Sequence, residues 1–238
     1  MKCLDLFCCD GGAAMGLSRA GFDEIVGIDI ESHPNYPFEF IQGDATDPPV
    51  KLNDFDFIWS SPPCQDSSLA SNDAKIHHGK IYPQLIPKTR ELLLKSGKPF
   101  VIENVVNAPI RNDLTLCGLS FGLRIFRHRR FEINGFKVVR KPHCQHSYRH
   151  KIGIDIVGVY GNGSVRDGNS HKVSVCQEAM CIFHTDIHKA LREAVPPAYS
   201  EYIGREFFRT RGAPRSLSTP SRQTHIKSGG SDDYKTIF

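Results

Sequence analysis

The sequence lacks the features that direct a protein to a membrane or out of the cell. It contains no apolar run long enough to span a bilayer, and Met1-Lys2 leads directly into an apolar stretch with no cleavable signal peptide. Its eight cysteines follow no regular spacing, and Cys8 and Cys9 are adjacent. A disulfide framework is therefore not expected, and the cysteine pattern favours a reducing compartment. We expect a cytoplasmic protein with no membrane contact.

Internal repeats are also absent, and the charge is spread unevenly. The 238 residues are 39% hydrophobic and 24% charged, which is typical of one globular domain or one domain with a small insertion. The segment 209–238 carries six basic and two acidic residues, which accounts for the whole formal charge of +4. Because this segment is rich in Ser, Thr, Gly and Pro, we expect a disordered basic tail. Such a tail is usually only solvated, although it could attract a polyanion without sequence preference.

Short apolar segments alternate with helical periodicity over most of the chain. Residues 4–7 resemble a strand, Gly11 and Gly12 follow, and helix formers occupy 13–20 before Gly21, a natural helix C-cap. Further strands are expected at 24–30, 38–41, 55–59, 99–102 and 127–133, and helices at 82–95 and 194–204. This order predicts an α/β fold, a Rossmann-like sheet with helices on both faces.

Acidic residues follow the second and third expected strands. Asp29 lies about 20 residues after the glycines, the spacing of a carboxylate that accepts from a ribose hydroxyl. Gly11 and Gly12 would let the backbone approach a ligand at a helix N-terminus. Asp44 could accept from an adenine amino group, or it could simply form a turn. Together these features predict an adenosine-type cofactor.

The fourth expected strand ends in Ser60-Ser61-Pro62-Pro63-Cys64. The two prolines fix φ at successive residues and place Cys64 rigidly at the edge where open α/β sheets bind ligands. Cys64 is either a nucleophile or a small buried hydrophobe. The long polar loop 66–78 suggests a lid that closes on substrate. Glu103 ends the next strand, so it is the third polar residue at this edge.

The βα rhythm is lost over 135–189, where Val157–Tyr160 is the clearest strand candidate. This region contains His143, Cys144 and His146, which together with Cys176 and Cys181 could be imagined as a zinc site. Their spacings do not match the usual zinc pairings, so loop chemistry is the preferred interpretation and no metal is predicted. Just before this region, the alternation over 127–133 places Arg127, Arg129 and Phe131 on one strand face, where solvent or phosphate contact is the default.

In this order and spacing, the motifs resemble those of the cytosine-C5 DNA methyltransferases, over residues 4 to about 132 and again over 194–204. The similar segments are the cofactor loop Asp5–Gly12, the ribose acid in Gly27–Ile30, the adenine-side acid in Gly43-Asp44, the catalytic motif Pro62–Gln65, the acid motif Glu103–Val105, Arg127-x-Arg129, and the cofactor helix with Ala194–Pro197 and Ile203-Gly204. Each segment is short, but their order is specific. The resemblance implies S-adenosylmethionine as cofactor and double-stranded DNA as partner.

The resemblance also implies a role for each matching residue. Cys64 would add to carbon 6 of a flipped-out cytosine, and a methyl group would move to carbon 5. Protonated Glu103 would donate at ring nitrogen 3 and Arg129 would hold the ring carbonyl oxygen. Arg127 would support Cys64 or contact phosphate. The implied cofactor contacts are Phe7, Gly11, Gly12, Asp29, Ile30, Asp44, Ala45 and Pro63.

Several positions depart from the family's pattern. The family usually has glycine where Cys9 stands, a small residue at Asp10, Gln at Ile125 and Gly-Asn at Arg192-Glu193, and an aromatic-Ser pair follows its catalytic Gln where Asp66-Ser67 stands here. The region available for target recognition, 135–189, is short. We therefore expect a compact, phage-type member that acts as a monomer in the cytoplasm of a bacterium or an infected host. The expected divisions are 1–134 (catalytic), 135–189 (target recognition), 190–208 (returning helix) and 209–238 (tail).

Two alternatives remain open at the level of sequence. The same chemistry could act on tRNA or another RNA, although the Cys-Phe-Thr signature of that branch is absent. A degenerate methyltransferase could bind nucleic acid without turnover, which Cys9, Asp10 and Glu193 would favour. Intact Cys64, Glu103 and Arg129 argue against degeneration.

Overall fold

The computed structural model describes residues 1–63, 85–144, 156–159 and 171–212. Cys64, the expected lid 66–78, His146 and nearly all of the basic tail lie outside these ranges. Within the described ranges, no helix combines the length and the apolar character needed to cross a bilayer.

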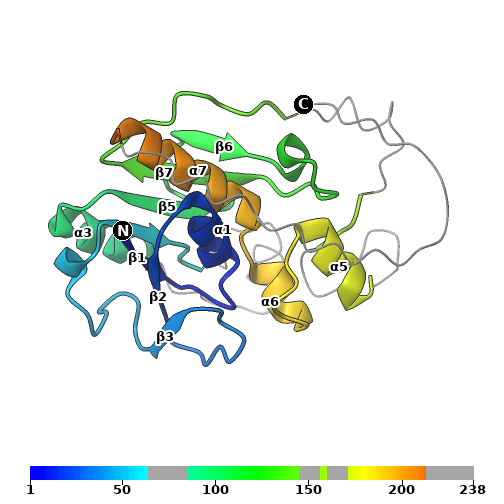
Figure 1. The fold of residues 1–238 in the computed structure, drawn as a ribbon, viewed down its shortest axis with the longest axis horizontal. Helices are drawn as coiled ribbons and strands as arrows, with labels where there is room; N and C mark the ends of the chain where they lie inside the picture. The colour runs from blue at the N-terminus through cyan, green and yellow to red at the C-terminus, as the bar shows by residue number, and fades with distance from the viewer. Residues whose placement is uncertain (64–84, 145–155, 160–170, 213–238) are drawn as a thin grey trace, which may run out of the picture.

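The described residues form a seven-stranded sheet with the order β3-β2-β1-β4-β5-β7-β6 (Figure 1). The parallel strands are β1 (Lys2–Leu6), β2 (Glu24–Asp29), β3 (Glu39–Gln42), β4 (Phe57–Ser60) and β5 (Phe100–Asn104). Strand β7 (Arg129–Asn134) runs antiparallel to both β5 and β6 (Leu114–Leu116). Because the chain winds outward in both directions from β1 and β4, the topological switch point lies between these two strands. The sheet confirms the Rossmann-like prediction.

Helices cover both faces of the sheet, as predicted. On one face, α1 (Gly12–Ala20) and α7 (Pro197–Thr210) pack with side chains that include Cys3, Phe57 and Trp59. On the other, α3 (Leu85–Ser96) contributes Ile86 and Leu93 to a cluster with the alternate strand residues. Each fully buried side chain of this size contributes about 1.5–3 kcal/mol to stability. The alternation of buried strand residues therefore fixes which helix covers which face.

Small residues allow α1 and α7 to cross at close range (Figure 1). A Cβ atom at Gly16 would lie 2.0 Å from the carbonyl oxygen of Pro197, and one at Gly204 would lie 2.7 Å from the Cβ of Ala20. Helix α7 begins with Pro197 in its first turn, where a missing N–H costs nothing. It continues to Thr210, so the first two residues of the segment expected to be disordered are helical.

Several other elements differ from the predictions, and strand β6 was not predicted at all. Residues 156–159 form no strand; instead the amide of Val157 donates to the carbonyl of Arg124 (2.8 Å). Strand β7 begins at Arg129, two residues later than predicted. A helix that was not predicted, α5 (Val173–Met180), buries Cys176, Ala179 and Met180 and is followed by α6 (His188–Glu193). Two short 3-10 turns, η1 (Leu52–Asp54) and η2 (Gly118–Phe121), complete the described elements.

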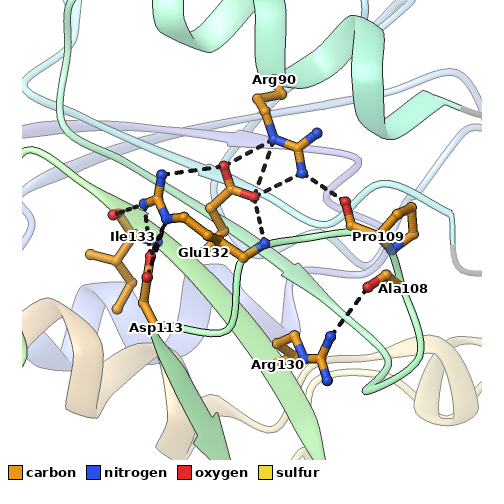
Figure 2. Close-up of polar contacts among 8 residues, drawn as sticks. Arg90, Ala108, Pro109, Asp113, Arg130, Glu132 and Ile133 are labelled. Carbon is orange, nitrogen blue, oxygen red and sulfur yellow. Dashed lines mark hydrogen bonds and ion pairs between the residues drawn. The ribbon is translucent and has the colours of Figure 1, made fainter.

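A buried carboxylate connects β7 to the helix behind it. Glu132 is 2% exposed, and Arg90 of α3 donates to both of its oxygens at 2.8–3.2 Å (Figure 2). The amide of Arg111 donates to the same carboxylate (3.0 Å), and the Arg111 guanidinium bonds Asp113 and the carbonyl of Ile133. This network holds β7 against α3. It thereby also restrains the start of β7 at Arg129, three residues before Glu132.

Candidate active site

The residues singled out from the sequence converge on one edge of the sheet. Strands β1, β2, β4 and β5 all end at this edge because they are parallel. Antiparallel β7 begins here, since Asn104 pairs with Arg130. The edge spans the switch point between β1 and β4, which is where open α/β sheets bind ligands.

Glu103 is a buried acid at this edge, with 5% exposure. The Nε atom of Arg129 lies 2.8 Å from Glu103 Oε1, which makes a close ion pair. This oxygen has no aligned hydrogen bond among the described residues, so the pair is near but poorly directed. Burial raises the pKa of Glu103, and the charges of Arg129 and Arg127 and the polar contacts with Ser61 and Arg129 offset this effect only in part. Glu103 therefore keeps its proton to a higher pH than an exposed glutamate.

The segment before Cys64 lies against the end of β5. The side-chain amide of Asn104 donates to the carbonyl of Pro62 (2.8 Å), while its oxygen accepts from the amide of Val105 (2.9 Å). The indole of Trp59 donates to the hydroxyl of Ser61 (2.9 Å). These bonds hold Ser61-Pro62-Pro63 beside the end of β5, where Glu103 lies. Cys64 is the next residue along the chain and lies outside the described ranges.

The carboxylate of Asp29 lies at the end of β2 and organises the glycine turn across from it. Its Oδ2 accepts from the amide of Cys9 and its Oδ1 from the amide of Glu31, both at 3.1 Å. Ile30 follows and is 70% exposed, although it is a large apolar residue. The carboxylate of Asp29 suits the ribose of an adenosine cofactor, and the exposed side chain of Ile30 suits its adenine.

Asp44 lies just past β3, near the same edge. It is exposed, and its Oδ1 accepts from both the amide and the hydroxyl of Thr46 at 2.7 Å. Two hydrogen bonds from Thr46 lower the pKa of Asp44, and the side-chain bond contributes more than the backbone bond. Asp44 is therefore an ionised acceptor, and it also closes a turn, so the two interpretations left open by the sequence are compatible. The neighbouring Ala45 is buried.

The comparisons with known proteins agree with this geometry. Residues 1–113 match the model of the C-5 cytosine-specific DNA methylases. This match covers just under half of the chain. The matched segment includes the positions of Cys64 and Glu103 and ends before Arg127 and Arg129.

Individual relatives match shorter segments. The chain is 32% identical over 81 residues to a type II methyltransferase, M.HgiDI, of Herpetosiphon aurantiacus, covering 29% of this chain and 26% of the relative. It is 28% identical over 131 residues to a type II methyltransferase, M1.HphI, of Haemophilus parahaemolyticus, covering 46% and 34%. These matches span about a quarter to a third of the relatives' length. Among solved structures, a prophage-encoded protein of E. coli described as a DNA modification methyltransferase superposes with a TM-score of 0.60 at 13% identity, covering 89% of this chain and 99% of that one.

The structure gives a physical account of Cys9, which stands where the C-5 cytosine-specific DNA methylase family usually has glycine. Phe7, Cys9 and Gly11 all adopt the left-handed region, with φ of 58°, 44° and 84°. A side chain in this region costs roughly 1–2 kcal/mol, which glycine avoids. Gly12 serves packing, since a Cβ there would lie 2.5 Å from the carbonyl oxygen of Val195.

Asp10, a second departure from the family's pattern, anchors a distant segment. Its carboxylate accepts from His33 Nδ1 (2.7 Å) and from the hydroxyl of Thr185 (2.6 Å), and its carbonyl accepts from His184 Nε2 (2.6 Å). Asp10 is 3% exposed, so this side chain, which is larger than the residue usual in the family, is buried. Each of its carboxylate oxygens accepts a hydrogen bond. Sequence analysis missed His33, His184 and Thr185; the unusual acid at Asp10 was the available signal.

Arg127 has a different place from the one expected. It precedes β7, is 5% exposed, and donates to the carbonyls of Val159 (2.6 Å) and Arg192. The hydroxyl of Tyr199 donates to the carbonyl of Arg127. Because its guanidinium is buried and bonded to carbonyl oxygens, Arg127 is not available to contact phosphate. It instead joins the chain before β7 to the segments of Val159 and Arg192. Its charge still reaches Glu103 and lowers the pKa of that acid.

Proposed function

We propose that this chain is an S-adenosylmethionine-dependent DNA (cytosine-5)-methyltransferase. The observation that carries the proposal is the buried Glu103–Arg129 pair beside Ser61-Pro62-Pro63, directly before Cys64. Few reactions need a protonated acid and a guanidinium next to a thiol at a sheet edge. Attack on carbon 6 of a pyrimidine is one of them, because the ring then needs proton donation and charge stabilisation at its other edge.

The cofactor contacts suit S-adenosylmethionine. Asp29 would accept from the ribose hydroxyls, exposed Ile30 would pack on the adenine, and Asp44 would accept from the adenine amino group. Phe7, Gly11, Gly12, Ala45 and Pro63 would line the remainder, with the left-handed turn at Gly11 turning backbone toward the cofactor. When bound, the cofactor supplies an electrophilic methyl group on its sulfonium.

The chain's own residues would prepare the base for that group. The Cys64 thiolate would form a bond to carbon 6, and the electron pair displaced from the 5,6 double bond would make carbon 5 nucleophilic. Glu103 would give its proton to ring nitrogen 3, and Arg129 would bind the ring carbonyl oxygen. After carbon 5 is methylated, a base removes its remaining proton and the bond to Cys64 breaks. Burial raises the pKa of Glu103, which favours the protonated acid that this step needs.

The substrate we propose is double-stranded DNA from which the target cytosine is flipped out. The segment 135–189 would read the sequence around the target, and a monomer in the cytoplasm would suffice. Type II methyltransferase relatives and the family model support DNA as substrate.

Radiolabelled methyl transfer to duplex DNA tests the proposal. We expect the wild-type chain to label duplex DNA, Cys64→Ser to lose labelling, and Cys181→Ser, which alters an exposed cysteine beyond α5, to retain it. Equal labelling by wild type and Cys64→Ser would refute the mechanism. Preferential labelling of tRNA in a competition assay would refute DNA as the substrate, and bisulfite sequencing would report the base and its context.

A further inference from the structure

Three potential metal ligands lie together beside Arg127 and Arg129, away from the expected cofactor loop Asp5–Gly12. Cys117 directly follows β6, His128 directly precedes β7, and Cys144 lies in the chain that continues from β7. One ligand atom from each residue, the two sulfurs and an imidazole nitrogen, lies within 4.8 Å of the other two. None of the three has a part in the proposed methyl transfer.

We propose that Cys117, His128 and Cys144 bind a zinc ion that holds the segment Arg127–Arg129 in place. Thiolate sulfur and imidazole nitrogen are the ligands that zinc prefers in proteins, and a tetrahedral site can combine them. Three protein ligands leave one tetrahedral position for a further donor or solvent. We assign the ion a positioning role because none of its three ligands takes part in the proposed methyl transfer, although three protein ligands with an open fourth position also occur in catalytic zinc sites.

The distances agree with this assignment. In a tetrahedral site with Zn–S near 2.3 Å and Zn–N near 2.05 Å, sulfur and nitrogen ligands lie roughly 3.6 Å apart, and two sulfurs roughly 3.8 Å apart. The Sγ of Cys144 lies 3.5 Å from Nε2 of His128. The other separations are at most 4.8 Å, so adjustments on the order of 1 Å complete the geometry.

The ligands are positioned by contacts that do not involve the ion. Cys117 is 1% exposed and precedes the η2 turn. From that turn, the hydroxyl of Ser120 donates to the carbonyl of His143 (2.8 Å), which holds the residue before Cys144 in place. His128 is held between Arg127, bonded to the Val159 carbonyl, and the first residue of β7. A preformed set of this kind lowers the ordering cost of binding a metal.

This set differs from the one considered on sequence grounds. Only Cys144 is shared: Cys176 is buried in α5, Cys181 is the residue that follows α5, and His146 lies outside the described ranges. Cys117 and His128 could not be associated with Cys144 by spacing, because they lie 27 and 16 residues before it and meet only through the β6–β7 pairing.

The location gives the ion a consequence for the active site. His128 stands between Arg127, which joins Val159 and Arg192, and Arg129, which pairs with Glu103. Anchoring His128 would restrict both neighbours. Cys117, His128 and Cys144 are therefore positioning residues, and metal removal should loosen the Glu103–Arg129 pair.

Metal analysis of the full chain, purified under reducing conditions and reconstituted with zinc, tests the proposal. We expect about one zinc ion per chain after dialysis. Cys144→Ser and His128→Gln should each reduce retention at least about tenfold, whereas the neighbouring His143→Ala and the exposed Cys181→Ser should retain wild-type zinc. Wild-type protein without zinc, or equal retention in all four variants, would overturn the proposal.

Cobalt substitution provides a readout independent of methyl transfer and of global folding. Cobalt bound to the wild type and to Cys181→Ser should show the visible bands of a tetrahedral site and a near-ultraviolet thiolate band. The thiolate band should weaken in Cys144→Ser while the circular dichroism of the variant stays native. An octahedral spectrum in the wild type, or an unchanged thiolate band in Cys144→Ser, would contradict the assignment.

Discussion

Two glutamates on neighbouring strands are both almost shielded from solvent, yet their pKa values shift in opposite directions. Glu103 of β5 is 5% exposed and Glu132 of β7 is 2% exposed. In the register of the two strands, Glu103 pairs with Phe131 and Glu132 pairs with Ile102, so the two side chains point to opposite faces of the sheet. Burial raises the pKa of both acids, but the net shift is upward for Glu103 and downward for Glu132.

Glu103 loses more of its solvation on burial than Glu132, and the two carboxylates also receive different donors. Glu132 accepts from Arg90 at both oxygens and from the amide of Arg111, and these bonds outweigh its burial (Figure 2). Glu103 has Arg129 at 2.8 Å, but its Oε1 lacks an aligned hydrogen bond among the described residues. A fully bonded carboxylate stays ionised and stabilises the fold. An incompletely bonded one holds a proton that it can donate, which is what the proposed chemistry needs.

The largest difference between the two acids should appear in activity. Glu103→Gln removes the transferable proton, so we expect methyl transfer to fall roughly 10²–10⁴-fold, with little change in the thermal unfolding midpoint. Single-turnover kinetics on duplex DNA measure the effect. A variant within about threefold of wild type would show that Glu103 has no role as a proton donor.

The second largest effect should appear in stability. Glu132→Ala leaves the charge of Arg90 without its partner, and we expect a loss of about 3 kcal/mol in the free energy of unfolding. This is the low end of the usual range because the Arg90 side chain is 29% exposed and water relieves part of the cost. Urea denaturation measures it, with Glu103→Gln as the matched control. A loss below about 1 kcal/mol would mean that the network in Figure 2 contributes little.

A smaller effect should separate the two arginines. Arg90→Lys keeps the charge but cannot reproduce the paired bonds to Glu132 or the bond to the carbonyl of Pro109, so we expect a loss of about 1–2 kcal/mol. Arg129→Lys disturbs one close but imperfectly aligned contact with Glu103, so its stability should stay within about 0.5 kcal/mol of wild type. Its methyl transfer should nevertheless decrease, since lysine does not match the guanidinium geometry. Equal stability losses in both variants would remove the distinction between the pairs.

Local patterns were sufficient to predict the five parallel strands and the edge at which they end, but not strand β6 or the antiparallel direction of β7. Alternating apolar runs predicted the boundaries of β1 to β5 to within two residues. The acids Asp29 and Glu103 were singled out because parallel strands end at the same edge of a sheet. The large exposed fraction of Ile30 agrees with its predicted cofactor contact, which itself stays a prediction.

Contacts between distant segments could not be predicted in the same way. Arg127 looked like a strand residue because Arg127, Arg129 and Phe131 alternate, but the hydrogen bonds to Val159 and Arg192 take it out of β7. The Asp10–Thr185 bond joins residues 175 positions apart, and no sequence period reports such a bond. Helix α5 was missed because its buried Cys176, Ala179 and Met180 form only a short apolar stripe.

The pH dependence of stability offers the finest comparison of the two acids. The raised pKa of Glu103 means that the folded state binds its proton more tightly than the unfolded state does. Wild-type stability should therefore decline relative to Glu103→Gln as the pH rises above about 4.3, the usual glutamate pKa, until the folded-state pKa is passed. The lowered pKa of Glu132 gives the opposite result. Wild-type stability should exceed that of Glu132→Gln above about pH 4.3, and this advantage should shrink as the pH falls through the folded-state value. Urea unfolding of the three proteins from about pH 2 to pH 8 measures both slopes, that of Glu132 below about pH 4.3 and that of Glu103 above it. Slopes of the same sign would mean that burial alone, and not the number of donors, sets the behaviour of these two carboxylates.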